Sequence, residues 1–462
     1  MLYVVKRDGR TVEFNIDKIS NAIKKAATEE GVSLKTSQVF DCVQKVINYI
    51  EMTEKKSISV EEIQNLVEKA LRDSGHENIA ISYSTYRNER TKIREIKSDL
   101  MKAIQQIGVE TDRDNANVGN NFSSKLLRIA SESNKWHTLA SMPKKLAKAH
   151  ETGDLYYHDL DSYNLTTNCL HIPTREVLEK GFNTGYGTIN SPKRIETAAE
   201  LSCILLQSTQ NDMFGGQSHP DFDNDLGIFV EPTRKEIKKE LEELGVPSER
   251  IESILEKKVR ERVHQAMQGV VFNLNTMHSR AGSQVPFSSV NIGIPNSDDA
   301  ALVCEIFLEE YEKGLGKGEQ PIFPNIIFRV KDGVNREEGD PYYYLYKLAC
   351  RVAAKRMNPT FMNIDADFNK EYYNQGYMPA TMGCRTYLMK NVNGEPGCKG
   401  RGNIAPTTIN LPRIGIQAKG NIEKFFELFQ ERIDLAEEAL MHRYGVLKNL
   451  RVKDLPFVAG QH

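Results

Sequence analysis

The side chain best placed to do chemistry is Cys384, in the run Met382-Gly383-Cys384-Arg385. It is one of seven cysteines and lies between a strand-like approach and a polar exit. No second cysteine is close enough for a CxxC pair, so a metal site or dithiol exchange is not indicated here. Cysteine is most often a small buried apolar residue. The rest of the chain must therefore decide whether Cys384 is reactive.

Composition excludes several classes of protein. The chain has 462 residues, 39% of them hydrophobic, which indicates more than one domain with a sizeable core. The formal charge of -2 gives no basic surface for nucleic acid. No apolar run is long enough for a bilayer, and the N-terminus becomes charged too early for a signal peptide. The scattered, odd set of cysteines suits a reducing compartment. We expect a cytoplasmic protein without nucleic-acid or membrane partners.

Residues 1–95 are predicted to form an α+β module. Two short strand-like runs flank Asp8-Gly9, a strong hairpin signal, and Asn15 can cap the helix that follows. Ser59 and Glu62 have the spacing of a capping box before a further helix. Lys6, Arg7 and Lys18 lie near the hairpin. Charge alone favours a solvated basic edge over a phosphate site.

Residues 96–462 are predicted to form the second domain. After a charged helical stretch to about residue 107, an Asn- and Gly-rich loop at 110–121 marks the boundary region. Ser191-Pro192 has the pattern of a helix start. A helical hairpin is expected from 231 to 268. Strand-like and helical runs then alternate, which favours a largely parallel sheet or barrel. The expected strands are Val270–Asn275, Phe287–Ile292, Pro324–Val330 and Thr407–Ile414, with a helix at Tyr342–Arg356.

The other cysteines have plainer interpretations. Cys42, Cys203, Cys304 and Cys350 lie on apolar helical faces and are expected in the core. Cys398 follows an irregular segment and is interpreted as a bystander.

The N-terminal run from Val4 to Ile19 resembles the opening of an ATP-cone domain, the nucleotide-sensing module of many ribonucleotide reductases. The resemblance implies binding of ATP or dATP as an allosteric effector. It carries nucleotide-contacting positions onto Lys6, Arg7, Asn15 and Lys18, with Arg90 as a weaker candidate.

An ordered set of short segments along nearly the whole chain resembles the anaerobic (class III) ribonucleoside-triphosphate reductases. Each is weak alone, but their order behind an ATP cone is specific. The segments are Tyr157-His158-Asp159-Leu160-Asp161, Asn168-Cys169, Gly215-Gly216-Gln217, Leu274-Asn275-Thr276-(x)3-Arg280, Pro321-Ile322-Phe323-Pro324, Lys355-Arg356-Met357-(x)1-Pro359, Met382-Gly383-Cys384-Arg385 and Asn410-Leu411-Pro412-Arg413-Ile414.

This resemblance implies a ten-stranded α/β barrel with a finger loop through its centre. Cys384 matches the cysteine that becomes a thiyl radical, and Cys169 matches its partner on the other face of the substrate. An S–H bond is close in strength to the ribose C3′–H bond, so a shielded thiyl can abstract that hydrogen and later return it. Either Asn403 or Asn410 is implied near the substrate.

The resemblance also implies partners and cofactors: a ribonucleoside triphosphate substrate, formate as reductant, a radical-SAM activating enzyme and a homodimer. The family's glycyl radical and zinc site lie in a C-terminal region that has no match here. We therefore expect an incomplete barrel that is inactive alone. It is either the N-terminal piece of a split or truncated reductase, with a separate C-terminal fragment as a partner, or part of a longer product.

Two alternatives stay open. One is another glycyl-radical enzyme, such as a relative of pyruvate formate-lyase, although those lack the cone. The other is a non-catalytic nucleotide-binding protein that retains the cone as a regulatory module or a remnant.

Overall fold

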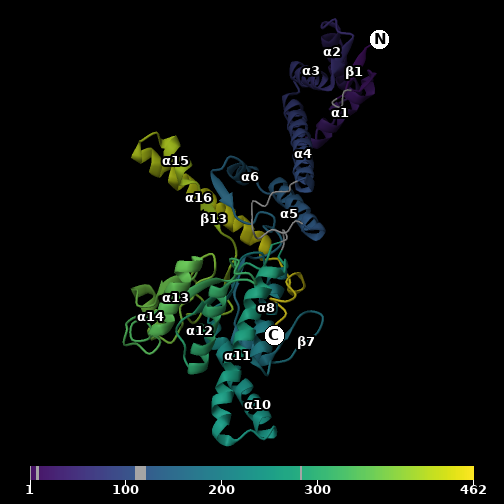
Figure 1. Ribbon diagram of the computed structural model, residues 1–462. Coiled ribbons are helices and arrows are strands. Elements are labelled where there is room, and N and C mark those ends of the chain that lie inside the picture. The colour runs from purple at the N-terminus through teal and green to yellow at the C-terminus, as the bar shows by residue number, and fades with distance from the viewer. Residues whose placement is uncertain (1, 7–9, 110–120, 281–283, 462) are drawn as a thin grey trace. The chain divides into compact units, whose positions relative to one another are not determined.

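A computed structural model describes residues 2–6, 10–109, 121–280 and 284–461 (Figure 1). The chain divides into two compact units, Met1–Lys102 and Ala103–His462. The predicted loop at 110–121 lies almost entirely outside the described residues. Among the residues described, no helix is both long and apolar enough to span a bilayer.

The N-terminal unit is an α+β module, as predicted. Its sheet has the order β2-β1-β3, with β1 antiparallel to β2 and parallel to β3. The capping signals are confirmed: Asn15 accepts from the Asp17 amide, and Ser59 forms a capping box with Glu62. Apolar side chains of the helices form its core, including Ile23 and Val46. The elements are β1 (Tyr3–Val5), β2 (Thr11–Glu13), α1 (Ile16–Glu29), α2 (Thr36–Glu51), β3 (Ser57–Ser59), α3 (Val60–Asp73) and the start of α4 (Glu77–Val109).

The second unit is built on a sheet of order β11-β10-β9-β8-β5-β12 in the described part of the chain. Its first five strands are parallel, and β12 runs antiparallel to β5. The strands of this sheet are β5 (Cys169–His171), β8 (Gln217–His219), β9 (Ser288–Ile292), β10 (Asn325–Val330), β11 (Thr360–Asn363) and β12 (Gly402–Asn403). Two further pairs are antiparallel: β4 (Leu155–Tyr157) with β13 (Thr407–Ile409), and β6 (Phe182–Asn183) with β7 (Thr188–Ile189).

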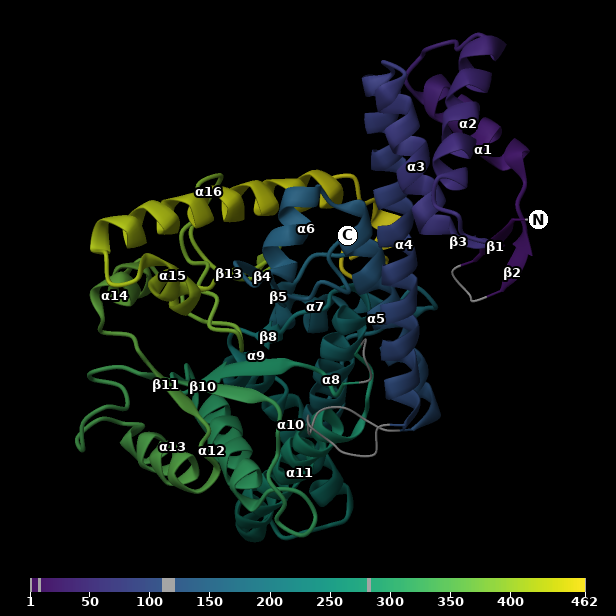
Figure 2. The same ribbon diagram turned by 90° about the horizontal axis from the view of Figure 1, so that it is seen from above.

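Helices cover this sheet. Figure 2 shows α12 and α13 on one side of β10 and β11, with α15 and α16 on the other. Side chains of α8, α11 and α12 form one large apolar core with the central strands. The helices are α5 (Phe122–Ser141), α6 (Lys144–Glu151), α7 (Thr174–Lys180), α8 (Ile195–Asp212), α9 (Phe222–Gly227), α10 (Val230–Glu243), α11 (Ser248–Thr276), α12 (Asp298–Lys313), α13 (Tyr343–Arg356), α14 (Asp367–Asn374), α15 (Leu411–Ala418), α16 (Ile422–Leu447) and the short 3-10 helix η2 (Val452–Asp454).

The α/β architecture of the second unit, which follows an α+β unit in the chain, confirms the predicted fold class. The ten-strand count of the predicted barrel stays a prediction. The strands predicted at 287–292 and 324–330 and the helix predicted at 342–356 are confirmed, each beginning one residue later than predicted. The predicted helical hairpin is formed by α10 and α11.

Three local predictions are wrong. Val270–Asn275 is not a strand but the end of α11, where Met267, Val270, Val271 and Leu274 are buried at helical spacing. The strand predicted at 407–414 ends at Ile409, because Asn410 caps α15. Helix α8 begins at Ile195 and not at Ser191-Pro192.

One cysteine prediction is also wrong. Cys350 is exposed on α13, whereas Cys42, Cys203 and Cys304 are buried as expected. An amphipathic helix carries small apolar residues at the edge of its buried face, and sequence spacing alone does not say which side of that edge faces the core.

Candidate active site

Cys169 is the first residue of β5 and is buried. Its Sγ accepts a hydrogen bond from the Gly216 amide at 3.2 Å. The preceding residue, Gly215, lies so close that an added Cβ would stand 2.6 Å from this sulfur. Only glycine permits that approach of backbone to thiol.

Cys384 lies in a tight turn. Thr381 and Tyr387 form an isolated antiparallel bridge, and inside it the Arg385 amide donates to the Met382 carbonyl at 2.8 Å. Arg385 has a positive φ of 68°, uncommon for a residue with a side chain. The turn presents the exposed Cys384 at its tip.

Two buried polar side chains of β9 anchor this turn. Asn291 donates to the Thr381 carbonyl at 3.0 Å and accepts from the Thr381 amide at 3.1 Å. Ser289 accepts from the Gly383 amide at 3.0 Å. Both ends of the Asn291 amide are therefore used to fix the backbone that carries Cys384.

The two thiols meet although 215 positions separate them in the sequence. Their sulfurs are 3.7 Å apart, which is direct contact. Asn403 on β12 bridges the two segments: its Oδ1 accepts from the Cys169 amide at 3.1 Å, and its Nδ2 donates to Thr386 Oγ1 at 2.9 Å. Thr386 Oγ1 lies 3.0 Å from the Cys384 sulfur.

This contact makes the thiols unequal acids. The hydrogen bond from Cys169, helped by Thr386, lowers the pKa of Cys384 to about 5, although burial acts in the opposite direction. The same hydrogen bond, together with burial, raises the pKa of Cys169 above its ordinary value. At a pH between the two pKa values, Cys384 is therefore the thiolate and Cys169 the thiol that donates to it.

We expect Cys384 to react with iodoacetamide at a rate that levels off by about pH 6, since only the thiolate is nucleophilic. An unperturbed thiol, with a pKa of about 8.5, would still be accelerating at that pH. In Cys169→Ala the midpoint should move upward, because the hydrogen-bond donor is lost. Site-resolved mass spectrometry measures both. A matched Cys203→Ala variant should leave the midpoint in place, and an unshifted midpoint in Cys169→Ala would contradict the assigned cause.

The structure places the other predicted catalytic residue elsewhere. Asn410 caps α15 through the Arg413 amide, and its Nδ2 donates to the Gly153 carbonyl at 2.8 Å. Of the two asparagines, Asn403 alone hydrogen-bonds to the thiol-bearing segments. Cys398 is buried in a small separate cluster with Ala380 and Met389.

Sequence reasoning missed Ser289 and Asn291. They alternate with Val290 and Ile292 along β9, and every residue of this strand is buried. Polar residues at every second position of a strand without an exposed face could have signalled a polar interior surface.

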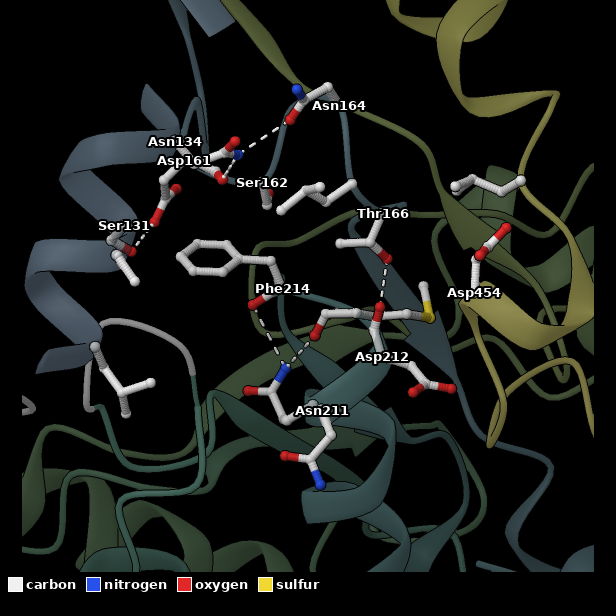
Figure 3. A pocket seen from close by; sticks show the side chains of 16 residues that line it. Ser131, Asn134, Asp161, Ser162, Asn164, Thr166, Asn211, Asp212, Phe214 and Asp454 are labelled. Carbon is white, nitrogen blue, oxygen red and sulfur yellow. Dashed lines mark hydrogen bonds between the residues drawn. The ribbon is translucent and has the colours of Figure 1, made fainter. Parts of the chain in front are cut away.

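A pocket of about 520 Å³ lies beside the Cys169 segment (Figure 3). It is lined by α5, the segment leading into β5, the end of α8 and residues near η2. Its polar lining includes Asp161, Asp212, Asn164 and Asn211, with no lysine or arginine among the described lining residues. Such a wall does not suit a phosphate group.

In the N-terminal unit, Lys18 lines a pocket of about 320 Å³ between α1 and α4, together with Lys25, Tyr83 and Tyr86. Lys6 donates its amide to the Arg10 carbonyl at 2.8 Å within the hairpin. Asn15 Oδ1 is engaged in capping α1. Arg7 lies outside the described residues, and so does the side chain of Arg90.

Across the described residues, no group of three or more His, Cys, Asp and Glu side chains is arranged to hold a metal ion.

Known proteins resemble this chain along nearly its whole length. Residues 114–462 match the family described as anaerobic ribonucleoside-triphosphate reductase, and residues 2–92 match the ATP cone domain. The anaerobic ribonucleoside-triphosphate reductase of Haemophilus influenzae is 32% identical over 98% of this chain, and that of Escherichia coli is 30% identical over 99%. The chain spans 64% of the length of each relative.

Solved structures show the same fold. The anaerobic ribonucleotide reductase from Thermotoga maritima, in complex with dATP and CTP, aligns with a TM-score of 0.54 and 19% identity. The alignment covers 80% of this chain and 64% of that one. The chain has an N-terminal ATP cone and belongs to the anaerobic ribonucleoside-triphosphate reductase family.

Proposed function

We propose that this chain supplies the paired-thiol centre that reduces ribonucleoside triphosphates to 2′-deoxyribonucleoside triphosphates, under control of ATP or dATP at the cone. The observation that supports it is the 3.7 Å contact between the sulfurs of Cys169 and Cys384. Two remote segments, each secured by buried polar groups, converge on this contact.

In the proposed reaction, Cys384 as a thiyl takes the hydrogen atom from ribose C3′. Cys169 donates a hydrogen atom to C2′ as the 2′-hydroxyl leaves as water. Formic acid restores that hydrogen to Cys169 and gives its remaining electron and proton to the sugar as it becomes carbon dioxide. Cys384 then returns its hydrogen to C3′. Formate is the proposed reductant. The balance is that one ribonucleoside triphosphate and one formic acid give one deoxyribonucleoside triphosphate, one carbon dioxide and one water.

The geometry adds a condition. Sulfurs in direct contact leave no room for a ribose between them, so substrate binding must part Cys169 and Cys384. Cys384 then loses the hydrogen bond that is the largest cause of its lowered pKa. Its proton affinity rises, which favours the S–H form that a hydrogen-atom donor needs. Asn403, bonded to both segments, is proposed to set how far they part.

A glycyl radical, generated by a radical-SAM activating enzyme, would supply the acceptor for the hydrogen atom of Cys384. The exposed position of Cys384 at the tip of its turn fits access by such a group. We assign neither the glycyl radical nor the family's zinc site to any residue of this chain. Homodimerisation and a C-terminal segment, on this polypeptide or a separate one, are also proposed.

The test is anaerobic conversion of CTP to dCTP by this chain with a C-terminal reductase segment, activating enzyme, S-adenosylmethionine and formate. Product formation that depends on formate supports the proposal. Nucleotide binding without reduction, under conditions where a complete relative is active, would instead indicate a non-catalytic nucleotide-binding protein.

For the cone, we expect Lys18→Ala to weaken ATP and dATP binding by about tenfold or more, since a charge-assisted hydrogen bond contributes about 1.5–3 kcal/mol. Lys18 lines the α1–α4 pocket. The matched control is Lys24→Ala, an exposed lysine on the same helix that is absent from that lining. Isothermal titration calorimetry measures both variants, and equal affinities would remove Lys18 from the site.

A further inference from the structure

The turn at 213–216 sets the position of the Cys169 sulfur. Gly216 donates its amide to that sulfur at 3.2 Å, and the Gly215 amide donates to the Asn168 carbonyl at 2.8 Å. Gly215 is packed so tightly that a Cβ would also stand 2.0 Å from Asn168 Oδ1. Any shift of this turn must therefore move Cys169 or break its hydrogen bond.

The buried side chain of Gln210 donates hydrogen bonds to three carbonyls of this turn. It lies in the last turn of α8 and is 3% exposed. Its Nε2 donates to the carbonyls of Met213 at 3.0 Å and Gly215 at 2.6 Å, with Phe214 more distant at 3.4 Å. Figure 3 shows Phe214 of this turn at the wall of the pocket.

The oxygen of the same amide reaches the segment that precedes β9. Gln210 Oε1 accepts from the amide of Phe287 at 2.9 Å, and Phe287 immediately precedes β9. Strand β9 carries Ser289 and Asn291, which hold the Cys384 turn. Gln210 thus ties the turn against Cys169 to the strand that holds Cys384. A glutamine needed only for packing would not require both ends of its amide to meet backbone groups of two separate segments.

We infer that Gln210 is a positioning residue for the thiol pair: through the 213–216 turn it aims the Gly216 amide at Cys169 and so keeps Cys169 against Cys384. This inference concerns the same two thiols as the proposed function and rests on that function. Its geometry, however, is testable on the thiols alone. The side chain of Gln217 also donates to the carbonyls of Gly215 at 3.0 Å and Asn168 at 3.3 Å. Its bonds to the β9 segment are made by its backbone, which donates to the Phe287 carbonyl at 2.8 Å and accepts from Ser289 Oγ at 3.4 Å.

The test compares Gln210→Met with the wild type. Methionine retains the length of glutamine but cannot donate to the carbonyls or accept strongly from Phe287. Gln207→Met is the matched control, because Gln207 lies one turn earlier on α8 and bonds Asn273 of α11 at 2.6 Å. Thermal unfolding and circular dichroism establish that each variant is folded.

Two measurements report the thiol geometry. Diamide takes up the two thiol hydrogens as the Cys169–Cys384 disulfide forms, and we expect its rate to fall at least about tenfold in Gln210→Met, because the sulfurs no longer meet. The pH midpoint of Cys384 alkylation should rise. Gln207→Met, even if less stable, should change neither quantity.

Unchanged disulfide rate and midpoint in a folded Gln210→Met variant would overturn the inference. If that variant does not fold, Gln210→Asn, which keeps the amide but draws it back from the turn, is measured in the same way and decides the matter. Because neither measurement requires turnover, failure here is distinguishable from failure of the reductase proposal.

Discussion

Replacement of Cys384 by alanine is expected to reduce CTP reduction by at least about a thousandfold, the scale seen when a group that takes part in bond breaking is removed. Cys384→Ser should be equally inactive, because an O–H bond is stronger than S–H and an oxygen radical is harder to form. The measurement is dCTP formed anaerobically by the activated, complete enzyme with formate present.

The control is Cys350→Ala. Cys350 is exposed, like Cys384, but lies on α13 away from the thiol pair. Its replacement should leave the rate within about twofold of the wild type. Residual activity of Cys384→Ala above about one tenth of the wild type would exclude Cys384 as the radical-carrying thiol. Cys169→Ala separates the two roles, because it should also lose product formation while leaving Cys384 available for activation.

The largest expected effect on stability is at Arg329. Its side chain is fully buried on β10 and lies 2.6 Å from an Asp221 oxygen and 3.4 Å from an Asp223 oxygen. Asp223 in turn accepts from the Gly293 amide at the end of β9. Arg329→Leu leaves these carboxylates without their cation, and breaking a buried pair in this way costs about 3–5 kcal/mol.

The matched control is Arg351→Leu. Arg351 pairs with Glu312 at 2.8 Å on an exposed helix surface, where an ion pair contributes about 0–1 kcal/mol. Urea unfolding followed by fluorescence of Trp136, the single tryptophan and a residue of the second unit, measures both variants. Similar losses in the two variants would show that the buried cluster does not stabilise the sheet.

The pH dependence of this loss has a defined sign. Burial raises the pKa of Asp223 to about 6, while Arg329 acts to lower it. Without Arg329 the folded-state pKa should rise further above the unfolded value of about 3.9. The folded variant then binds protons more readily than the unfolded chain, so the loss of stability should be larger at pH 8 than at pH 5.

Local signals in the sequence were sufficient for local structure. Asn15 and the Ser59–Glu62 pair begin helices where their side chains predict, because a cap is a hydrogen bond between residues two or three positions apart. The prediction of a strand at 270–275 was wrong because a short apolar segment suits a buried strand and a buried helix alike. The structure shows that this segment is the buried end of α11.

The amino-acid sequence, through its cysteine contexts and ordered motifs, identified Cys169 and Cys384 as candidates. The sequence could not decide which of Asn403 and Asn410 lies at the thiol pair, because the two differ only in their tertiary contacts. Tertiary structure decided that Asn403 joins the two thiol segments and that Asn410 caps a helix.

Tertiary structure alone also revealed the supports of the pair, Asn291 and Gln210. Their amides bond backbone groups of segments far away in the chain, and no spacing rule links such positions. Residue type and order determined which chemistry the chain can carry. The two sulfurs, 215 positions apart in the chain, lie together only once the parallel sheet has brought β5, β9 and the Cys384 turn together.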